Sequence, residues 1–430
     1  MQRMRQRGVS NEFWSGHGRR RAGEYRPVRK RPAGLGAGAR MTAMPVAAIE
    51  PAGDLWPLAF PRQTKVLMVL SALGAGGAER VATALGNYWV GHGADVTIAS
   101  FEAADAPTYF PLDPGVKVKR LGDGAARQPF LQAVGRTLSR IKALSALIRA
   151  ERPCVVVSFL TKINIISLLA APPETPVIIS ERNNPDRQHF NLLWRMARGA
   201  VFPRAAAMVA MTQGAIDAYP AREAPNAVVI PNPVVIPASL SRRSDGRMLT
   251  AVGRLARQKR FDLLIESFGR MARDHPGWRL TIWGEGDERK SLEALRDRLG
   301  LKDKVLMPGV SADPASWLET ADAFVLSSDF EGWGNVIAEA MAAGLPVVAT
   351  DCDFGPRDMI EHEVSGLLVP VGDPAAFDAA LSRLLTDELL RIRLGAAARS
   401  RAAAFSLPVL ARRWEELIAA AMIARRGQAG

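Results

Sequence analysis

The sequence predicts two α/β domains in tandem, each built around a parallel sheet that helices cover on both faces. Three observations support this fold class. A chain of 430 residues is too long for one typical hydrophobic core. Short, almost continuously apolar segments alternate with helix-like segments, as they do in βαβ units. A proline-rich stretch near the middle interrupts this alternation, which then starts again.

The first domain is expected over residues 61–230. Its predicted strands are KVLMVL (65–70), DVTIAS (95–100), CVVVSFL (154–160), PVIIS (176–180) and AMVAMT (207–212). Helical patterns lie between them at 81–91, 131–150 and 192–202. Strands that are apolar along their whole length are typical of a sheet buried on both faces, so these strands are expected to run parallel.

The linker is expected at residues 231–246, where three prolines and a polar cluster occur. The second domain follows at 247–405. Its predicted strands begin MLTAVGRL (248–255), RLTIWGEG (279–286), KVLMPG (304–309), AFVLSS (323–328), PVVAT (346–350) and GLLVP (366–370). Residues 406–430 are expected to form a terminal helix that packs back on the first domain.

The charge distribution limits the classes of partner that the protein is expected to bind. The net charge is +13, but residues 1–60 contain eleven Arg or Lys and four acidic residues, without periodic hydrophobicity. This segment is interpreted as a basic disordered tail or a misassigned start. The remaining basic charge favours anionic small molecules or an anionic membrane face over nucleic acid.

The cellular location is expected to be cytoplasmic, with peripheral contact to the inner membrane as an option. The two cysteines form no disulfide or metal pattern, and no apolar run reaches the length of a membrane span. The N-terminal segment has no apolar signal-peptide core. Two helical segments, PFLQAVGRTLSRIKALSALIRA (129–150) and NLLWRMARGAVFPR (191–204), mix apolar and basic residues, which suits either a membrane surface or a core helix with a solvated face.

The loops that follow strands are the candidate ligand sites, because ligands of doubly wound sheets bind at the carboxyl ends of the strands. With two such domains, the site is expected in the cleft between them. The loops are GRLARQK (253–259), GEG (284–286), SSDFEGWGN (327–335), LGAGGAER (73–80), TKIN (161–164) and ERNNPD (181–186).

Two cations and a glycine turn suggest a diphosphate. Arg254 and Lys259 share one strand-end loop, where charge-assisted bonds would each contribute about 1.5–3 kcal/mol. The alternative is ordinary solvated charge. The turn around Gly334 precedes a predicted helix start, whose free N–H groups suit phosphate. Glu339, one turn inside that helix, suits a ribose diol, and Glu331 would face the group beyond the phosphates.

The motifs of the second half closely resemble those of the family 4 glycosyltransferases, retaining enzymes of the GT-B fold with two Rossmann-like domains that face each other across a cleft. The matching pieces are PNP (231–233), VGRLARQKRFD (252–262), WGEGDER (283–289), PGVSAD (308–313), SSDFEGWGNVIAEAMAAGLPVVATD (327–351) and GPRDMIEHEVSGLLVPVGD (355–373). The first half matches more loosely, through GGAERV (76–81) and SERNNP (180–185). That loop is similar to those of the subset acting on lipid-linked glycans or exopolysaccharide precursors.

The resemblance implies a role for each matching residue. Arg254 and Lys259 would bind the donor diphosphate, Glu339 the ribose and Glu331 the transferred sugar. Gly334 and Asn335 would give backbone donors to the distal phosphate, and Gly76 and Gly77 would approach the donor from the acceptor-side domain. The implied donor set also contains Gly253, Gly284, Gly286 and Val336.

The sequence departs from the family pattern at two points. Trp333 stands where a smaller aromatic residue or leucine is usual, which is expected to reshape the sugar pocket. The histidine that many members place after a first-domain strand is absent, and Thr161, Lys162 or Asn164 could take its place. Glu181, Arg182 and His189 complete the candidate acceptor-side set.

The implied activity is transfer of a sugar from a nucleotide donor, most simply UDP-linked, to a polyprenyl-diphosphate-linked or other glycan. No His/Asp pair has base spacing, so a reaction without a protein base is expected, and no metal or cofactor is needed for it. The alternatives are a sugar-nucleotide 2-epimerase of the same fold, an NAD-dependent dehydrogenase and a non-catalytic nucleotide-binding module. The epimerase would need acids and histidines around the sugar, and the dehydrogenase would need a G-x-G-x-x-G after its first strand. A non-catalytic module would tolerate loss of Glu331, Arg254 or Lys259.

Overall fold

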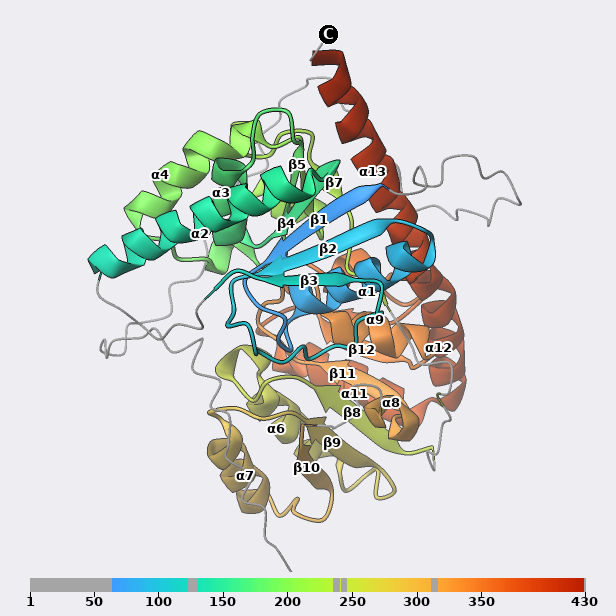
Figure 1. Ribbon diagram of the computed structural model, residues 1–430. Coiled ribbons are helices and arrows are strands. Elements are labelled where there is room, and N and C mark those ends of the chain that lie inside the picture. Colours follow the sequence, from blue (N-terminus) through green and yellow to red (C-terminus); the bar gives the residue numbers. More distant parts are fainter. Residues whose placement is uncertain (1–63, 123–129, 235–239, 241–245, 311–315, 429–430) are drawn as a thin grey trace, which may run out of the picture. The chain divides into compact units, whose positions relative to one another are not determined.

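The predicted fold class is confirmed by a computed structural model, which describes residues 64–122, 130–234, 240, 246–310 and 316–428. Two sheets, each with all strands parallel, are flanked by helices (Figure 1). The predicted tail at 1–60 and most of the predicted linker at 231–246 lie outside the described residues.

The first sheet has seven strands in the order β3-β2-β1-β4-β5-β6-β7. Their bounds are β1 Lys65–Leu70, β2 Asp95–Ser100, β3 Lys117–Arg120, β4 Val155–Phe159, β5 Val177–Glu181, β6 Ala207–Ala210 and β7 Val228–Val229. The order reverses direction at β1 and β4, which is the point where ligands bind in doubly wound sheets.

Strand β1 shows why the apolar runs predicted a parallel sheet. Val66, Met68 and Leu70 belong to one hydrophobic core, whereas Leu67 and Val69 belong to another. Successive side chains of a strand point to opposite faces, so a strand covered on both sides is apolar at every position.

The second sheet has six strands in the order β10-β9-β8-β11-β12-β13. Their bounds are β8 Met248–Val252, β9 Arg279–Trp283, β10 Val305–Gly309, β11 Ala323–Leu326, β12 Val347–Thr350 and β13 Leu367–Val369. All six lie within or next to the segments predicted as strands.

The helices connect the strands as crossovers. Those of the first half are α1 Gly77–Gly91, α2 Phe130–Glu151, α3 Thr161–Ala170, α4 Leu192–Val201 and α5 Gln213–Asp217, with 3₁₀ turns η1 Pro185–Arg187, η2 Phe202–Arg204 and η3 Ala221–Glu223. Those of the second half are α6 Phe261–Met271, α7 Arg289–Arg298, α8 Ser316–Thr320, α9 Asn335–Ala342, α10 Pro356–Met359, α11 Pro374–Thr386, α12 Glu388–Ala402 and α13 Leu407–Gln428, with η4 Arg257–Lys259 and η5 Ala403–Phe405.

Three elements differ from the sequence-based expectation. Strand β3 reads KVKR and is mostly exposed, so it lacks the apolar signal that marked the other strands. Strand β7 has only two residues, too few for any pattern. The prediction that the TKIN segment forms a loop is wrong. Helix α3 begins at Thr161, close behind the end of β4, so these residues form its first turn.

The last helix ties into the core of the first half. Helix α13 lies beside α1 and β4 (Figure 1). Its Trp414 is fully buried, with its ring 6.3 Å from the ring of Phe159. The same core contains Trp333 and Ile337, so one hydrophobic cluster joins residues of both halves. Within the described part of the chain, no helix combines the length and the apolar character that crossing a membrane requires.

Candidate active site

The start of α9 is the point where strand-end loops of both halves meet. Gly334 precedes this helix with φ of +88°, a backbone conformation that favours glycine. No side chain caps the helix, so its first N–H groups are left for another acceptor. A Cβ added at Gly77 would lie 3.4 Å from Asn335 Nδ2, which puts the start of α1 beside the start of α9.

Glu331 and Lys259, both predicted as site residues, form an ion pair. Lys259 Nζ lies 2.5 Å from Glu331 Oε1, and the Ser328 hydroxyl donates to the same oxygen at 2.7 Å. Both charged side chains are largely buried. The Asn184 amide, from the SERNNP loop, donates to the Glu331 carbonyl at 3.1 Å. The two charges therefore compensate each other at the edge of the junction.

Glu339 is buried and forms an ion pair with Arg80, which lies in the first turn of α1 although GGAER was expected as a loop. Burial raises the pKa of the Glu339 carboxyl, and the neighbouring Arg80 guanidinium opposes that shift. Arg80 and Glu339 come from opposite halves of the chain. A diol that binds the carboxylate would therefore have to share or replace the contact with Arg80.

Arg254 differs from the other site cations because it is exposed and makes no ion pair with the described residues. Its own loop touches the GEG loop closely. A Cβ at Gly284 would lie 1.9 Å from the Gly253 carbonyl oxygen, and one at Gly286 would lie 2.3 Å from that of Leu255. These two glycines thus allow two backbones to meet, which is a packing reason for their presence.

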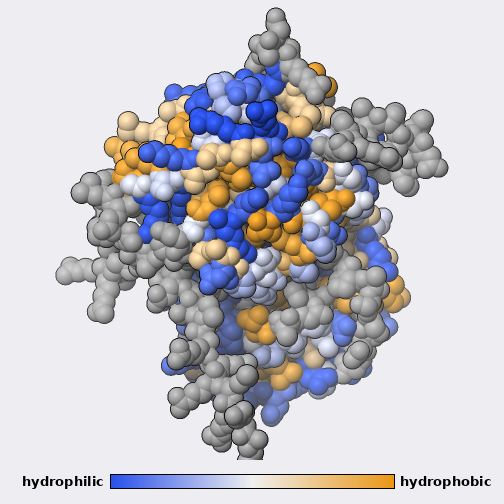
Figure 2. Space-filling model, in the orientation of Figure 1, coloured by the Kyte–Doolittle hydropathy of each residue, from blue (hydrophilic) through white to orange (hydrophobic). Residues whose placement is uncertain are grey.

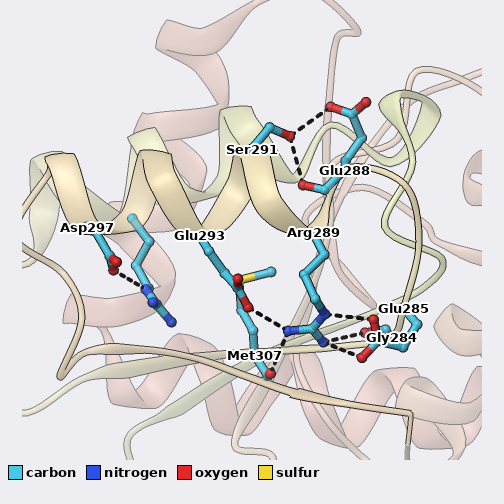
Figure 3. A network of polar contacts seen from close by, with 9 residues as sticks. Gly284, Glu285, Glu288, Arg289, Ser291, Glu293, Asp297 and Met307 are labelled. Carbon is cyan, nitrogen blue, oxygen red and sulfur yellow. Dashed lines mark hydrogen bonds and ion pairs between the residues drawn. The ribbon is translucent and has the colours of Figure 1, made fainter.

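Arg289 braces the GEG loop (Figure 3). Its guanidinium pairs with Glu285 and Glu293, at 2.7 and 2.8 Å, and donates to the carbonyls of Gly284 and Met307. These contacts connect the GEG loop to α7 and β10. They thereby fix the loop that packs against the loop of Arg254.

Three of the six predicted acceptor-side residues, Thr161, Asn164 and Glu181, form a buried cluster. Thr161 and Asn164 donate to the Glu181 carboxylate at 2.7 and 2.8 Å, and the Tyr219 hydroxyl donates at 3.1 Å. The Asn164 and Glu181 side chains are almost fully buried. Burial raises the pKa of Glu181, and the hydrogen bonds oppose that effect. Thr161 and Asn164 therefore support this carboxylate, in place of an exposed contact to substrate.

Lys162 and His189 lie apart from that cluster. Lys162 is exposed and stands 5.5 Å from the ring centre of Trp194, and His189 is exposed between η1 and α4. Arg182 is buried and donates to Ser180, Ile230 and Asn232. The structure thus divides the acceptor-side set into buried and surface residues.

Trp333 has a different surrounding from the one predicted. Its side chain is 3% exposed and packs edge-on against Phe405 at 5.4 Å. A Cβ at Gly355 would collide with the Trp333 carbonyl, so the backbone is held from the other side as well. The side chain is a core contact that anchors the loop before α9, in place of the predicted pocket-lining role.

Sequence reasoning missed three residues at the junction: Arg80, Asn184 and Asn232. All three make side-chain contacts from the first half or the PNP segment to the second. Each lies inside a motif that the sequence already marked, GGAERV, SERNNP or PNP, but polar residues of loops carry no periodicity that would show their partners. Among the described residues, no three His, Cys, Asp or Glu side chains come together as a metal site requires.

Two family models match the chain. The model described as "Glycosyl transferase 4-like domain" matches residues 76–233, and the model described as "Glycosyl transferases group 1" matches residues 235–401. The two matches adjoin at the segment between the sheets.

Individual relatives match over shorter stretches. An exopolysaccharide phosphotransferase of Streptomyces coelicolor is 37% identical, over 46% of this chain and 21% of its own length. The Campylobacter jejuni N-acetylgalactosamine-N,N'-diacetylbacillosaminyl-diphospho-undecaprenol 4-alpha-N-acetylgalactosaminyltransferase is 34% identical, over 39% of this chain and 45% of its own. The chain thus matches less than half the length of these curated relatives.

A solved structure matches over more of the chain. The Anabaena protein HepE in complex with UDP aligns with a TM-score of 0.66 and 18% identity, covering 83% of this chain and 99% of its own. A likeness at this identity concerns the fold.

Glu181 generates a prediction about the pH dependence of stability. The pKa of this carboxyl is raised in the folded protein, so the ionised form costs stability that is absent below the unfolded pKa of about 4.3. The cost should appear as pH rises through the folded pKa. The Glu181→Gln variant should therefore gain melting temperature relative to the native protein as pH is raised from 4 to 8.

Only the slope of that difference is diagnostic, because the amide also changes the hydrogen bonds of Thr161 and Asn164 by an amount independent of pH. Thermal unfolding at constant ionic strength measures it, with the exposed Glu174→Gln as the matched control. A difference that stays constant from pH 4 to 8 would show that burial does not raise the pKa.

Proposed function

This chain belongs to the family 4 glycosyltransferases of the GT-B fold, and we propose that it is a retaining enzyme that transfers a sugar from a nucleoside-diphosphate donor to a glycan. The donor is a UDP-linked hexose or N-acetylhexosamine, and the acceptor is a polyprenyl-diphosphate-linked glycan or a related one. The observation that carries the proposal is the uncapped start of α9 beside Gly77, with Lys259 and Glu331 paired next to it.

The donor diphosphate binds at the start of α9. Free N–H groups and the positive end of the helix favour an anion there. Arg254 adds a cation that no described acid neutralises, and Gly76 and Gly77 let the opposite loop approach without side chains. UDP is the first nucleotide to test because HepE, which has this fold, was solved with it.

The two glutamates contact the two ends of the donor. Glu331 accepts hydrogen bonds from the transferred sugar, while Lys259 neutralises the carboxylate and faces the diphosphate. Glu339 accepts from the ribose diol, which takes over part of its contact with Arg80. This division explains two buried carboxylates without a general acid/base pair, since each has its own cation.

The reaction follows from where charge develops. As the bond between the sugar C1 and the phosphate oxygen breaks, negative charge grows on the leaving diphosphate, and fixed cations and N–H groups stabilise it. The acceptor hydroxyl attacks C1 from the same face and gives its proton to the released phosphate oxygen. Configuration is retained, and no base from the protein and no metal is required.

A surface over α4 supports the proposal of a lipid-linked acceptor. Leu192, Leu193 and Met196 are 69%, 53% and 64% exposed, and the neighbouring Arg195 is exposed too. We call these four residues the α4 patch. Figure 2 shows hydrophobic surface over this helix, at the upper left, bordered by hydrophilic side chains. Apolar residues beside a cation suit the face of an anionic membrane, and the Campylobacter jejuni relative is named for a diphospho-undecaprenol-linked substrate.

Arg254→Ala tests the diphosphate assignment. Loss of one charge-assisted hydrogen bond corresponds to about 1.5–3 kcal/mol, so kcat/KM for the donor should fall about ten- to a hundredfold. Donors are first chosen by screening nucleotide sugars for protection against thermal unfolding. Arg254 is preferred to Lys259, because removing Lys259 would leave Glu331 buried and unpaired at a cost of about 3–5 kcal/mol.

The control is Arg257→Ala on the same loop. The Arg257 side chain is 92% exposed and lies 3.6 Å from Glu288, so its removal should leave transfer unchanged. Equal turnover in the Arg254 and Arg257 variants would contradict the assignment of Arg254 to the diphosphate.

Metal independence is a separate prediction. Transfer should proceed at an unchanged rate in excess EDTA, because Arg254, Lys259 and the helix start supply the positive charge that a divalent ion would provide. Inhibition by EDTA that added Mg²⁺ or Mn²⁺ reverses would contradict this mechanism.

The α4 patch predicts binding to vesicles. The native protein should sediment with vesicles that contain anionic phospholipid, less so at high salt, and a Leu192→Ser, Leu193→Ser, Met196→Ser variant should lose this binding. The matched control changes Leu389 and Ile392 of α12, 79% and 61% exposed, to serine. A triple variant that sediments like the native protein would rule out the α4 patch as the membrane contact.

A further inference from the structure

Arg182 is a buried cation whose role is left open by the site described so far. It is 7% exposed, and no carboxylate among the described residues pairs with it. Burial lowers the pKa of its guanidinium to about 9, so the side chain remains a cation at neutral pH. Its Nη1 donates to the Ile230 carbonyl and to Asn232 Oδ1, both at 2.9 Å. Both hydrogens of this nitrogen are thereby used.

The Arg182 contact determines the direction of the next hydrogen bond. An arginine only donates, so the Asn232 atom that faces it must be the oxygen. The amide nitrogen of Asn232 then points the other way, and it donates to Asn335 Oδ1 at 2.8 Å. The Asn335 oxygen already accepts this hydrogen bond. The Asn335 amide nitrogen is therefore the donor left at the end of the hydrogen-bonded series Arg182–Asn232–Asn335.

The free end lies where the donor diphosphate is proposed to bind. Asn335 is the first residue of α9, and its Nδ2 is the atom that a Cβ at Gly77 would approach to 3.4 Å. An unconstrained asparagine could present either its oxygen or its nitrogen to that space. Arg182 and Asn232 remove this choice, because only one orientation lets every member of the chain donate and accept correctly.

We propose that Arg182 and Asn232 are positioning residues that hold the Asn335 side chain with its N–H₂ toward the donor diphosphate. The chain Arg182–Asn232–Asn335 adds a side-chain donor to the backbone N–H groups of the helix start. It also links the buried cation of the first half to the anion site of the second. This inference rests on the proposed function, because it takes a nucleoside diphosphate as the ligand.

The hydrogen-bonded series Arg182–Asn232–Asn335 predicts that the isosteric change Asn232→Asp weakens UDP binding more than the truncation Asn232→Ala. In Asn232→Asp, the carboxylate accepts from Arg182 and also from Asn335, so the Asn335 amide turns its oxygen toward the diphosphate. In Asn232→Ala, the Asn335 amide is free to turn either way and still donates to the phosphate. We therefore expect the UDP dissociation constant to rise at least tenfold in Asn232→Asp and only two- to threefold in Asn232→Ala.

A double-mutant cycle separates this effect from the added negative charge. In an Asn335→Ala background no amide can turn over, so Asn232→Asp should weaken UDP binding no further than Asn335→Ala alone does. Titration calorimetry of the full chain with UDP measures the four dissociation constants, and uridine serves as the ligand without phosphate. Asn226→Asp is the matched control, since this exposed amide bonds the Ala206 carbonyl before β6, at the other end of the sheet.

The outcomes are distinct. If UDP, GDP and ADP all fail to bind the native protein, the proposed function fails, and this inference fails with it. If UDP binds but Asn232→Asp has the same effect with and without Asn335, the charge acts through space and the positioning role is wrong. If Asn232→Ala is as harmful as Asn232→Asp, the contact is merely structural and the inference is overturned as well. Thermal unfolding of each variant verifies that the chain is folded during the titrations.

Discussion

The start of α9 is the constraint on which the rest of the site depends. Gly334 takes a left-handed backbone conformation there, and Trp333 beside it is held in the core against Phe405. A flexible loop could not present N–H groups in a constant direction. Because the residue before the turn is buried, the helix start is fixed relative to both sheets. The proposed anion site is thus built from backbone geometry, and the charged side chains lie around it.

The charged side chains around this point are mostly paired with one another. Glu331 has Lys259 and Glu339 has Arg80, and each pair is largely buried. Burying a charge is costly unless it is paired and hydrogen-bonded, so each pairing offsets the cost of burying its two charges. Arg254 is an exception, because it is exposed and has no ion-pair partner among the described residues. Arg182 is the other exception, because it is buried among neutral hydrogen-bond acceptors.

Much of the fold could be predicted from the sequence, because burial on both faces leaves a continuous apolar run in each central strand. The exposed strand β3 and the short β7 were missed because neither buries such a run. The candidate loops were identified for a related reason: in a parallel sheet, every segment that follows a strand lies at the same edge. The misplaced loop at TKIN shows the limit of this rule. A helix can begin directly after a strand, and Thr161 and Asn164 then turn inward to support Glu181.

The sequence by itself determined the fold class, the segments that reach the junction and the residue types that suit a diphosphate, because these depend on local periodicity and on chemistry within single motifs. Only the tertiary structure decided which charges pair. Arg80 and Glu339 are 259 positions apart, and Asn232 and Asn335 are 103 apart. Their contacts depend on how two separately formed sheets pack together, and no local pattern records that packing. The same reason explains Trp333, since a core partner such as Phe405 is visible only once the chain has folded.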